Sequence, residues 1–256
     1  NLVLNLWFVL GMGWGIEGSA IGTLICQIAM AVALVWVLWR RTHGLDLSLV
    51  PHWGGIASSL RDGIPLLIRT LALRAALYVT TWVAARAGAI TMAAYQVTMT
   101  IWNLLLMTMD ALGIAGQALT GASLGAGDIR RTRLLTGTMT RWGVWAGVVI
   151  GALLAASHQL VPAIYTNDPA VHRAVAAGLL VVAVEQVIAG PAFILDGVLI
   201  GAGDGRWLSR AQVVMFLVYL PMAWAVHLWA PADPAAAVVW LWIAFGGFMA
   251  VRDRKS

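Results

Sequence analysis

Four polar residues recur every seven positions within one long apolar stretch of the sequence. They are Gln96, Asn103, Asp110 and Gln117. In an α-helix, seven residues bring the chain back to within about 20° of the same direction, so the four side chains would form one stripe. An Asp in a membrane-spanning helix is costly unless it faces a bundle interior or a water-filled cavity. We therefore predict that the stripe faces a cavity and that Asp110 binds a cation or a proton there; the alternative is an Asp permanently paired between helices.

Three further charged residues interrupt other apolar segments, namely Arg74, Glu185 and Asp196. Arg74 is expected either to bind anionic groups or to pair with an acid such as Asp110. Glu185 is expected to share the binding function of Asp110 or to be structural. Asp196 lies eleven residues after Glu185, on the same helical face within about 20°. Because Asp196 is nearer a helix end, we expect it to gate or cap.

Several other polar or breaking residues complete the candidate set. Gln96, Asn103 and Gln117 are expected either to form hydrogen bonds between helices or to line the cavity. Pro191 follows Gly190 inside an apolar run, which predicts a bend that could act as a hinge. Arg69 and Arg141 are expected to extend along the helix to the membrane surface, as long basic side chains do.

The composition identifies the surroundings of these residues. Of 256 residues, 61% are hydrophobic and 11% are charged, whereas soluble domains are about 45–50% apolar and about 25% charged. The sequence therefore predicts an all-α, polytopic membrane protein in contact with the lipid bilayer. Its formal charge of +5 is scattered over short loops, which argues against nucleic acid as a partner.

Apolar runs of about 20 residues separated by turn residues predict the membrane crossings. The chain opens with Asn1 and an apolar run that is too short to span, Leu2–Leu10, which we interpret as the end of a helix whose beginning is missing. Seven full spans are predicted: Ala20–Trp39, Gly63–Ala85, Ala93–Leu119, Leu134–Ala156, Ala174–Leu199, Trp207–Trp229 and Ala235–Val251.

The basic residues predict the orientation of these spans. When the loops are numbered alternately, one side holds eleven of the 16 Lys and Arg residues, whereas the other side holds only Arg86 and Arg173. Since Lys and Arg accumulate on the cytoplasmic side of membrane proteins, the first side is predicted to be cytoplasmic. Its basic residues are Arg40, Arg41, Arg61, Arg130, Arg131, Arg133, Arg206, Arg210, Arg252, Arg254 and Lys255.

An internal repeat links two of the predicted cytoplasmic turns. The segments are GASLGAGDIR, ending at Arg130, and GVLIGAGDGR, ending at Arg206, 76 residues later. The repeated Asp is expected to cap the helix that follows each turn. Counting back 18 residues from each Asp leads to Asp110 and to the neighbour of Glu185, so the repeat predicts similar depths for these two acids.

Motifs for enzymatic chemistry are weak. GASLG fits the G-x-S-x-G pattern of a hydrolase with Ser123 as nucleophile, but that motif follows a strand, and here a membrane helix precedes it. The scattered histidines lack metal-ligand spacing, and no G-x-x-x-x-G-K-[ST] sequence would bind ATP. We predict no enzyme activity, no metal and no cofactor other than a coupling ion.

Several longer segments carry a family resemblance. The chain resembles the multidrug and toxic compound extrusion (MATE) family, specifically its DinF-like branch, in AAYQVTMTIWNLLLMTMDALGIAGQALTGASLGAGD, VPAIYTNDPAV, FILDGVLIGAGDGRW and GWGIEGSAIGTLICQ. The resemblance implies twelve helices in two six-helix lobes facing each other across a cavity. Residues 1–39 would then end the N-terminal lobe, 40–62 would link the lobes on the cytoplasmic side, and 63–256 would form the C-terminal lobe. The DinF-like branch uses an acidic residue of the first helix for proton coupling, and this sequence does not contain that helix.

The resemblance implies a secondary antiporter of the plasma membrane. It would export cationic or amphipathic small molecules in exchange for H⁺ or Na⁺, together with the missing N-terminal lobe. One alternative is a lipid-linked saccharide flippase of the same superfamily, whose cavity would be more basic. The other is an intramembrane serine hydrolase using Ser123, which Ser123→Ala would test.

Overall fold

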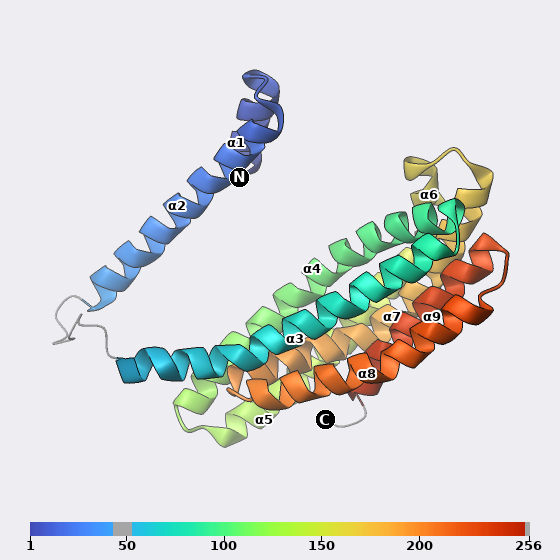
Figure 1. The fold of residues 1–256 in the computed structure, drawn as a ribbon. Coiled ribbons are helices and arrows are strands. Elements are labelled where there is room, and N and C mark those ends of the chain that lie inside the picture. Colours follow the sequence, from blue (N-terminus) through green and yellow to red (C-terminus); the bar gives the residue numbers. More distant parts are fainter. Residues whose placement is uncertain (43–52, 254–256) are drawn as a thin grey trace. The chain divides into compact units, whose positions relative to one another are not determined.

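The structure is a computed structural model that describes residues 1–42 and 53–253, and these residues are helical with short connections (Figure 1). This confirms the all-α fold. The elements in chain order are α1 (Leu2–Asn5), the π-helix η1 (Leu6–Gly11), α2 (Gly15–Thr42), α3 (Trp53–Arg86), α4 (Ala89–Gly125), α5 (Ile129–Ser157), α6 (Leu160–Tyr165), α7 (Pro169–Gly201), α8 (Gly205–Trp229) and α9 (Pro234–Asp253).

Six of these helices are long and apolar enough to cross a membrane, namely α2, α3, α4, α5, α7 and α8. The seventh predicted span coincides with α9, whose apolar part within the described residues, Pro234–Gly247, is shorter than a full crossing. The helices extend beyond the predicted spans because apolar runs mark only the segment within hydrocarbon. For example, α4 has 37 residues and continues through polar ends. The short helix α6 was not predicted.

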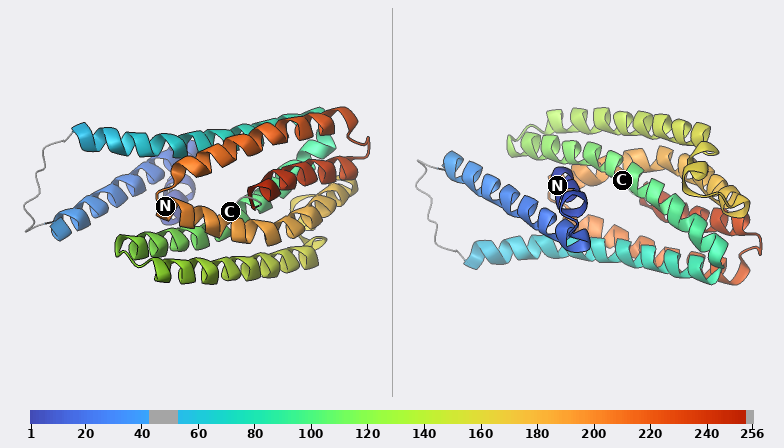
Figure 2. Two further views of the ribbon diagram at one scale, coloured as in Figure 1. Left: turned by 90° about the horizontal axis from the view of Figure 1, so that it is seen from below. Right: turned by 90° about the horizontal axis from the view of Figure 1, so that it is seen from above.

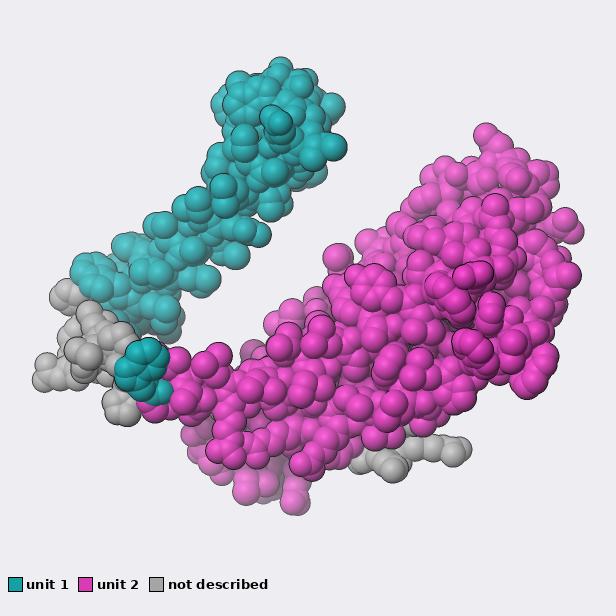
Figure 3. All heavy atoms as spheres, in the orientation of Figure 1, with its two compact units in different colours: residues 1–53 teal, residues 54–256 magenta. Residues whose placement is uncertain are grey.

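The chain divides into two compact units, Asn1–Trp53 and Gly54–Ser256 (Figure 3). In the first, α1 and η1 fold back along α2. Gly18 of α2 faces Phe8, and Gly22 faces Asn5, so both glycines allow this close approach. The predicted division into lobes and a linker at 40–62 remains a prediction; part of that linker, 43–52, lies outside the described residues.

In the second unit, α7 is the helix with the most extensive contacts, chiefly with α4, α5 and α9. Figure 2 shows α3 and α8 side by side along one edge of this bundle and α5 along the other. A 2.5 Å hydrogen bond between the hydroxyls of Thr80 and Tyr219 joins α3 to α8. Helix α7 is therefore the most enclosed of the long helices, with 56% of its most apolar stretch buried.

Glycines allow α5 and α7 to pack backbone against backbone. Gly143, Gly147 and Gly151 line one face of α5 at intervals of four residues. A methyl group on Gly143 would lie 2.8 Å from the carbonyl oxygen of Gly190 in α7, and one on Gly147 would collide with the carbonyl of Gln186. Membrane helices lack a hydrophobic drive to associate, so close contact between small residues holds them together by van der Waals packing.

A similar contact places α4 on the other side of α7. A methyl group on Gly113 of α4 would lie 2.8 Å from the carbonyl oxygen of Phe193, and one on Gly197 of α7 would collide with the carbonyl of Gly113. Nearer the C-terminal ends of both helices, Gly121 of α4 faces Gly201 of α7. These contacts fix the register of two parallel helices and hence the relative depth of their side chains.

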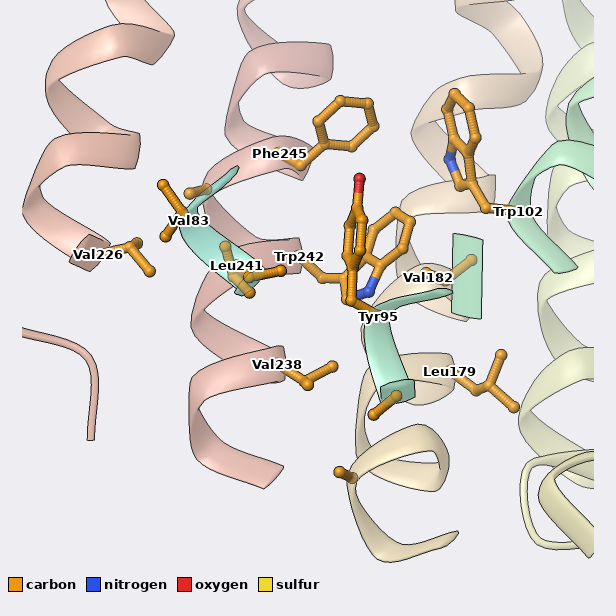
Figure 4. Close-up of a cluster of buried hydrophobic side chains, with 14 of the residues drawn as sticks. Val83, Tyr95, Trp102, Leu179, Val182, Val226, Val238, Leu241, Trp242 and Phe245 are labelled. Atoms are coloured by element: carbon orange, nitrogen blue, oxygen red, sulfur yellow. The ribbon is translucent and has the colours of Figure 1, made fainter. Parts of the chain in front are cut away.

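Aromatic side chains of α4 and α9 lie together in the interior of the bundle (Figure 4). Trp242 and Phe245 of α9 contact each other edge to face at 5.7 Å between ring centroids, and Phe245 meets Trp102 of α4 at 5.3 Å. Tyr219 of α8 approaches Phe245 at 6.3 Å. Edge-to-face pairs of this kind are favourable beyond the area that they bury.

The two repeated turns have the same local structure. Gly127 and Gly203 adopt positive φ angles of 73° and 79°, a conformation that side-chain-bearing residues avoid. Asp128 accepts a 2.8 Å hydrogen bond from the Arg131 amide, and Asp204 accepts one of 3.2 Å from the Trp207 amide. The predicted caps of α5 and α8 are confirmed.

Candidate functional site

The polar stripe of α4 lies on the surface of the second unit. Gln96, Asn103, Asp110 and Gln117 are all exposed, whereas residues such as Thr98, Trp102 and Met109 on the opposite face are buried. The Asn103 amide donates to the Met99 carbonyl of its own helix at 2.9 Å. Within the described chain, no member of the stripe has a hydrogen bond to another helix. The stripe therefore does not hold this unit together, and its facing a cavity remains a prediction.

The ion pair expected at Arg74 is not found. Arg74 is exposed, and it pairs with neither Asp110 nor any other acid that the structure describes. Instead, Arg69 of α3 pairs with Asp196 of α7, whose side chain is 7% exposed. The expectation that Arg69 extends to the membrane surface is therefore wrong, because a partner 127 residues away in sequence holds its guanidinium.

Glu185 is the buried acid of the bundle. It lies on α7 and is 7% exposed, and neither carboxylate oxygen has a hydrogen-bond partner among the described residues. Its carboxyl group abuts Gly246 of α9, where a methyl group would collide with it. Trp242, four residues earlier on α9, has a buried indole N–H that likewise lacks a partner. An unpaired carboxylate in so dry a place strongly favours binding of a proton or a cation.

Asp110 and Glu185 differ in depth and in burial within the second unit. Gly113 of α4 lies between Phe193 and Gly197 of α7, which puts Asp110 about level with Ala192. Glu185 then lies about seven residues, or about 10 Å by helix rise, farther from the repeated turns. The repeat predicted similar depths because it aligns the turns, whereas the packed helices are staggered by more than one turn. Moreover, Asp110 is exposed and Glu185 is buried.

Pro191 lies inside α7, which continues without interruption from Pro169 to Gly201. Proline has no amide hydrogen, so one hydrogen bond of the helix is absent there. Gly190 next to it is tightly packed against Gly143. A hinge at Pro191 remains a prediction, and any bend would have to slide α7 along α5.

Ser123 has the contacts of a structural residue. It is 5% exposed, and its hydroxyl is 2.8 Å from the Thr132 hydroxyl and donates to the Thr120 carbonyl at 3.2 Å. No base contacts it within the part of the chain that the structure describes. In the same residues, no three His, Cys, Asp or Glu side chains gather as metal ligands would.

Sequence reasoning missed two features of the arrangement. Gly246 makes room for the Glu185 carboxyl. In the sequence it is only one of two adjacent glycines in an apolar helix, which does not indicate which residue of another helix it contacts. The pairing of Arg69 with Asp196 had no signal at all in the spacing, because the two residues belong to different helices.

Comparison with known proteins identifies relatives. The MatE family model matches residues 65–225. Protein DETOXIFICATION 45, chloroplastic, of Arabidopsis thaliana is 30% identical over 96% of this chain and 42% of its own length. The probable multidrug resistance protein NorM of Xanthomonas campestris is 28% identical over 79% of this chain and 44% of its own length. The chain thus spans less than half the length of these relatives.

A solved structure has the same fold. A MOP superfamily transporter from Pyrococcus furiosus superposes with a TM-score of 0.82 at 19% identity, covering 97% of this chain and 57% of that one. For that transporter, a reverse polarity of the binding pocket suggests a different function.

Proposed function

The chain belongs to the MatE family of membrane transporters, and we propose that it contributes the C-terminal lobe of a secondary antiporter that exports cationic or amphipathic small molecules in exchange for H⁺ or Na⁺. Its relatives are about twice as long, so the other lobe of the same protein is the proposed partner. The plasma membrane is the proposed location. The transported compound would move between the lobes, and the coupling ion would bind to residues of this chain.

Glu185 is the observation that carries this proposal. A carboxylate buried without a hydrogen-bond partner among the described residues is costly when it is charged and alone. Binding a proton or Na⁺ removes that cost, so occupancy of the site can be coupled to a change in helix packing. Gly246 of α9 touches the carboxyl group, so any movement of α9 relative to α7 would alter the site.

The exposed stripe of α4 is the proposed contact surface for cargo. Asp110 supplies a negative charge, and Gln96, Asn103 and Gln117 supply uncharged hydrogen-bonding groups along the same face. Arg69 is neutralised by Asp196, which leaves the exposed Arg74 as the opposing charge at a similar predicted depth in the membrane. Two acids against one free arginine favour cationic cargo over the anionic cargo of a lipid-linked saccharide flippase.

A transport assay in vesicles tests the proposal. The protein, including its N-terminal lobe, is reconstituted into liposomes, and uptake or release of a cationic dye is followed under an imposed H⁺ or Na⁺ gradient. The wild type should move the dye in response to one of the gradients. Glu185→Gln keeps the size of the side chain but removes its charge, and it should abolish the gradient dependence.

Thr108→Ala is the matched control, since it alters an exposed polar residue of α4 outside the stripe, whose hydrogen bond stays within the helix. This variant should keep its gradient dependence. The proposal fails if Glu185→Gln responds to the gradient as the wild type does, or if the wild type moves an anionic lipid-linked sugar in place of the dye.

A further inference from the structure

A basic groove lies at one end of the bundle, between the N-terminal half of α3 and the first turns of α8. It encloses about 390 Å³ and is lined by Arg61, Ile64, Pro65 and Ile68 of α3 and by Arg206, Ser209 and Arg210 of α8. This is the end at which α3 begins and at which the α7–α8 turn lies (Figure 1). The groove is separate from Glu185 and from the stripe of α4.

The three arginines of the groove have no carboxylate partner among the described residues. Arg61, Arg206 and Arg210 are exposed and form no ion pair there. Arg69, two turns after Arg61 on the same helix, is by contrast held by Asp196. Three unpaired guanidinium groups around one groove repel each other and attract an anion, and guanidinium binds phosphate oxygens with two parallel hydrogen bonds.

Apolar side chains form the remaining wall. Ile64 and Ile68 are one turn apart on α3 and are 53% and 41% exposed. On the α8 side of the groove, the hydroxyl of Ser209 can donate a further hydrogen bond. A free phosphate ion has no apolar part that could pack against two exposed isoleucines. A phospholipid has acyl chains that would lie along them.

We propose that this groove binds an anionic phospholipid of the cytoplasmic leaflet, with its phosphate on the three arginines and its acyl chains against Ile64 and Ile68. The cytoplasmic leaflet follows from the distribution of basic residues along the sequence, in which these arginines belong to the richer side. Basic pockets between membrane helices on that side are suited to anionic head groups. The lipid would connect α3 to α8 at the point where α3 enters the bundle.

The repeated turn provides a matched control. Arg130 occupies the same place after the α4–α5 turn as Arg206 does after the α7–α8 turn, and Arg131 follows it. Both are exposed, and neither lines the groove. Replacing this pair removes the same charge from the same end of the bundle without touching the proposed site.

The test measures lipid binding and not transport. The purified protein in detergent is titrated with phosphatidylglycerol, and bound lipid is counted by native mass spectrometry, with the unfolding temperature recorded alongside. Each arginine lost is expected to weaken binding about 5-fold, because a basic residue near an anionic lipid surface contributes about 1 kcal/mol. Arg206→Gln with Arg210→Gln should thus weaken binding about 25-fold, and Arg130→Gln with Arg131→Gln should leave it unchanged.

Other results overturn the proposal. Equal losses in the two double variants would mean that surface charge alone attracts the lipid. Competition by glycerol phosphate at the same concentration as phosphatidylglycerol would indicate a site for free phosphate, and equal binding of phosphatidylcholine would exclude charge recognition. If the double variant does not fold, Arg61→Gln, on the other wall of the groove, should give the 5-fold loss by itself.

Discussion

Helices α4 and α7 end in the same repeated turn, yet they present their acids in opposite ways. In the most apolar stretch of α4, 22% of the residues are buried, whereas in α7 the fraction is 56%. Asp110 of α4 is consequently exposed, and Glu185 of α7 is enclosed. The turns themselves match, with the same positive-φ glycine and the same capping Asp.

The difference in burial between the two acids arises from the helices that pack around α4 and α7, and not from the repeated sequence. Helix α7 has α4, α5 and α9 around it, so few of its faces remain open. Helix α4 packs one face on α7 and leaves the stripe uncovered within this unit. The internal repeat thus predicts the shared turn, but not the same burial for the acids that precede it.

The largest expected effect comes from opening the glycine contact that encloses α7. Gly147→Val should destabilise the bundle by about 3 kcal/mol or more, because the new side chain meets the Gln186 backbone, which cannot move aside. Thermal unfolding in detergent measures this. Gly137→Val on the same helix is the control, since a methyl group there has open space. Equal losses of unfolding free energy in the two variants would contradict the close packing of α5 on α7.

The next largest effect is expected from breaking the ion pair that joins α3 to α7. Asp196→Asn should cost about 2 kcal/mol, because it leaves the partly buried Arg69 without its charge partner. Arg69→Gln should cost a similar amount. The double variant should cost less than the two single changes added together. Additive losses would show that the pair does not couple the helices.

Transport should separate the two acids. Glu185→Gln is expected to lower coupled dye transport at least about ten-fold, equivalent to about 1.4 kcal/mol. Asp110→Asn should mainly raise the dye concentration needed for half-maximal transport, because an exposed carboxylate acts on cargo and not on the coupling ion. Vesicle transport across a range of dye concentrations distinguishes them. If both variants changed the transport rate and the half-maximal dye concentration in the same way, the two acids would belong to a single shared site.

The smallest effect should be the same in both repeat units. Asp128→Ala and Asp204→Ala each remove a helix cap and should each cost about 1 kcal/mol of unfolding free energy. The variants Asp128→Asn and Asp204→Asn keep a capping oxygen and should cost less. Thermal unfolding measures both losses. Clearly unequal losses in the two turns would mean that the turns share a backbone conformation but not the energetic contribution of their capping Asp.

Much of the fold could be predicted because membrane helices carry strong local signals. Apolar length located α2 to α8 apart from α6, and Gly-Asp spacing located both repeated turns with their caps. The same signals placed Asp110 and Glu185 in membrane segments. They could not assign depth across helices, since the stagger of α4 against α7 depends on where Gly113 and Gly121 meet the other helix.

The sequence by itself determined the long helices, the two repeated turns with their caps, the membrane setting and the family resemblance. These features depend on residues close together in the chain, where composition and periodicity act directly. Only the tertiary structure decided that Glu185 is enclosed beside Gly246 and that Arg69 pairs with Asp196 and not with the lipid surface. Those outcomes depend on which helices become neighbours, and neighbouring faces are selected by packing between residues far apart in sequence.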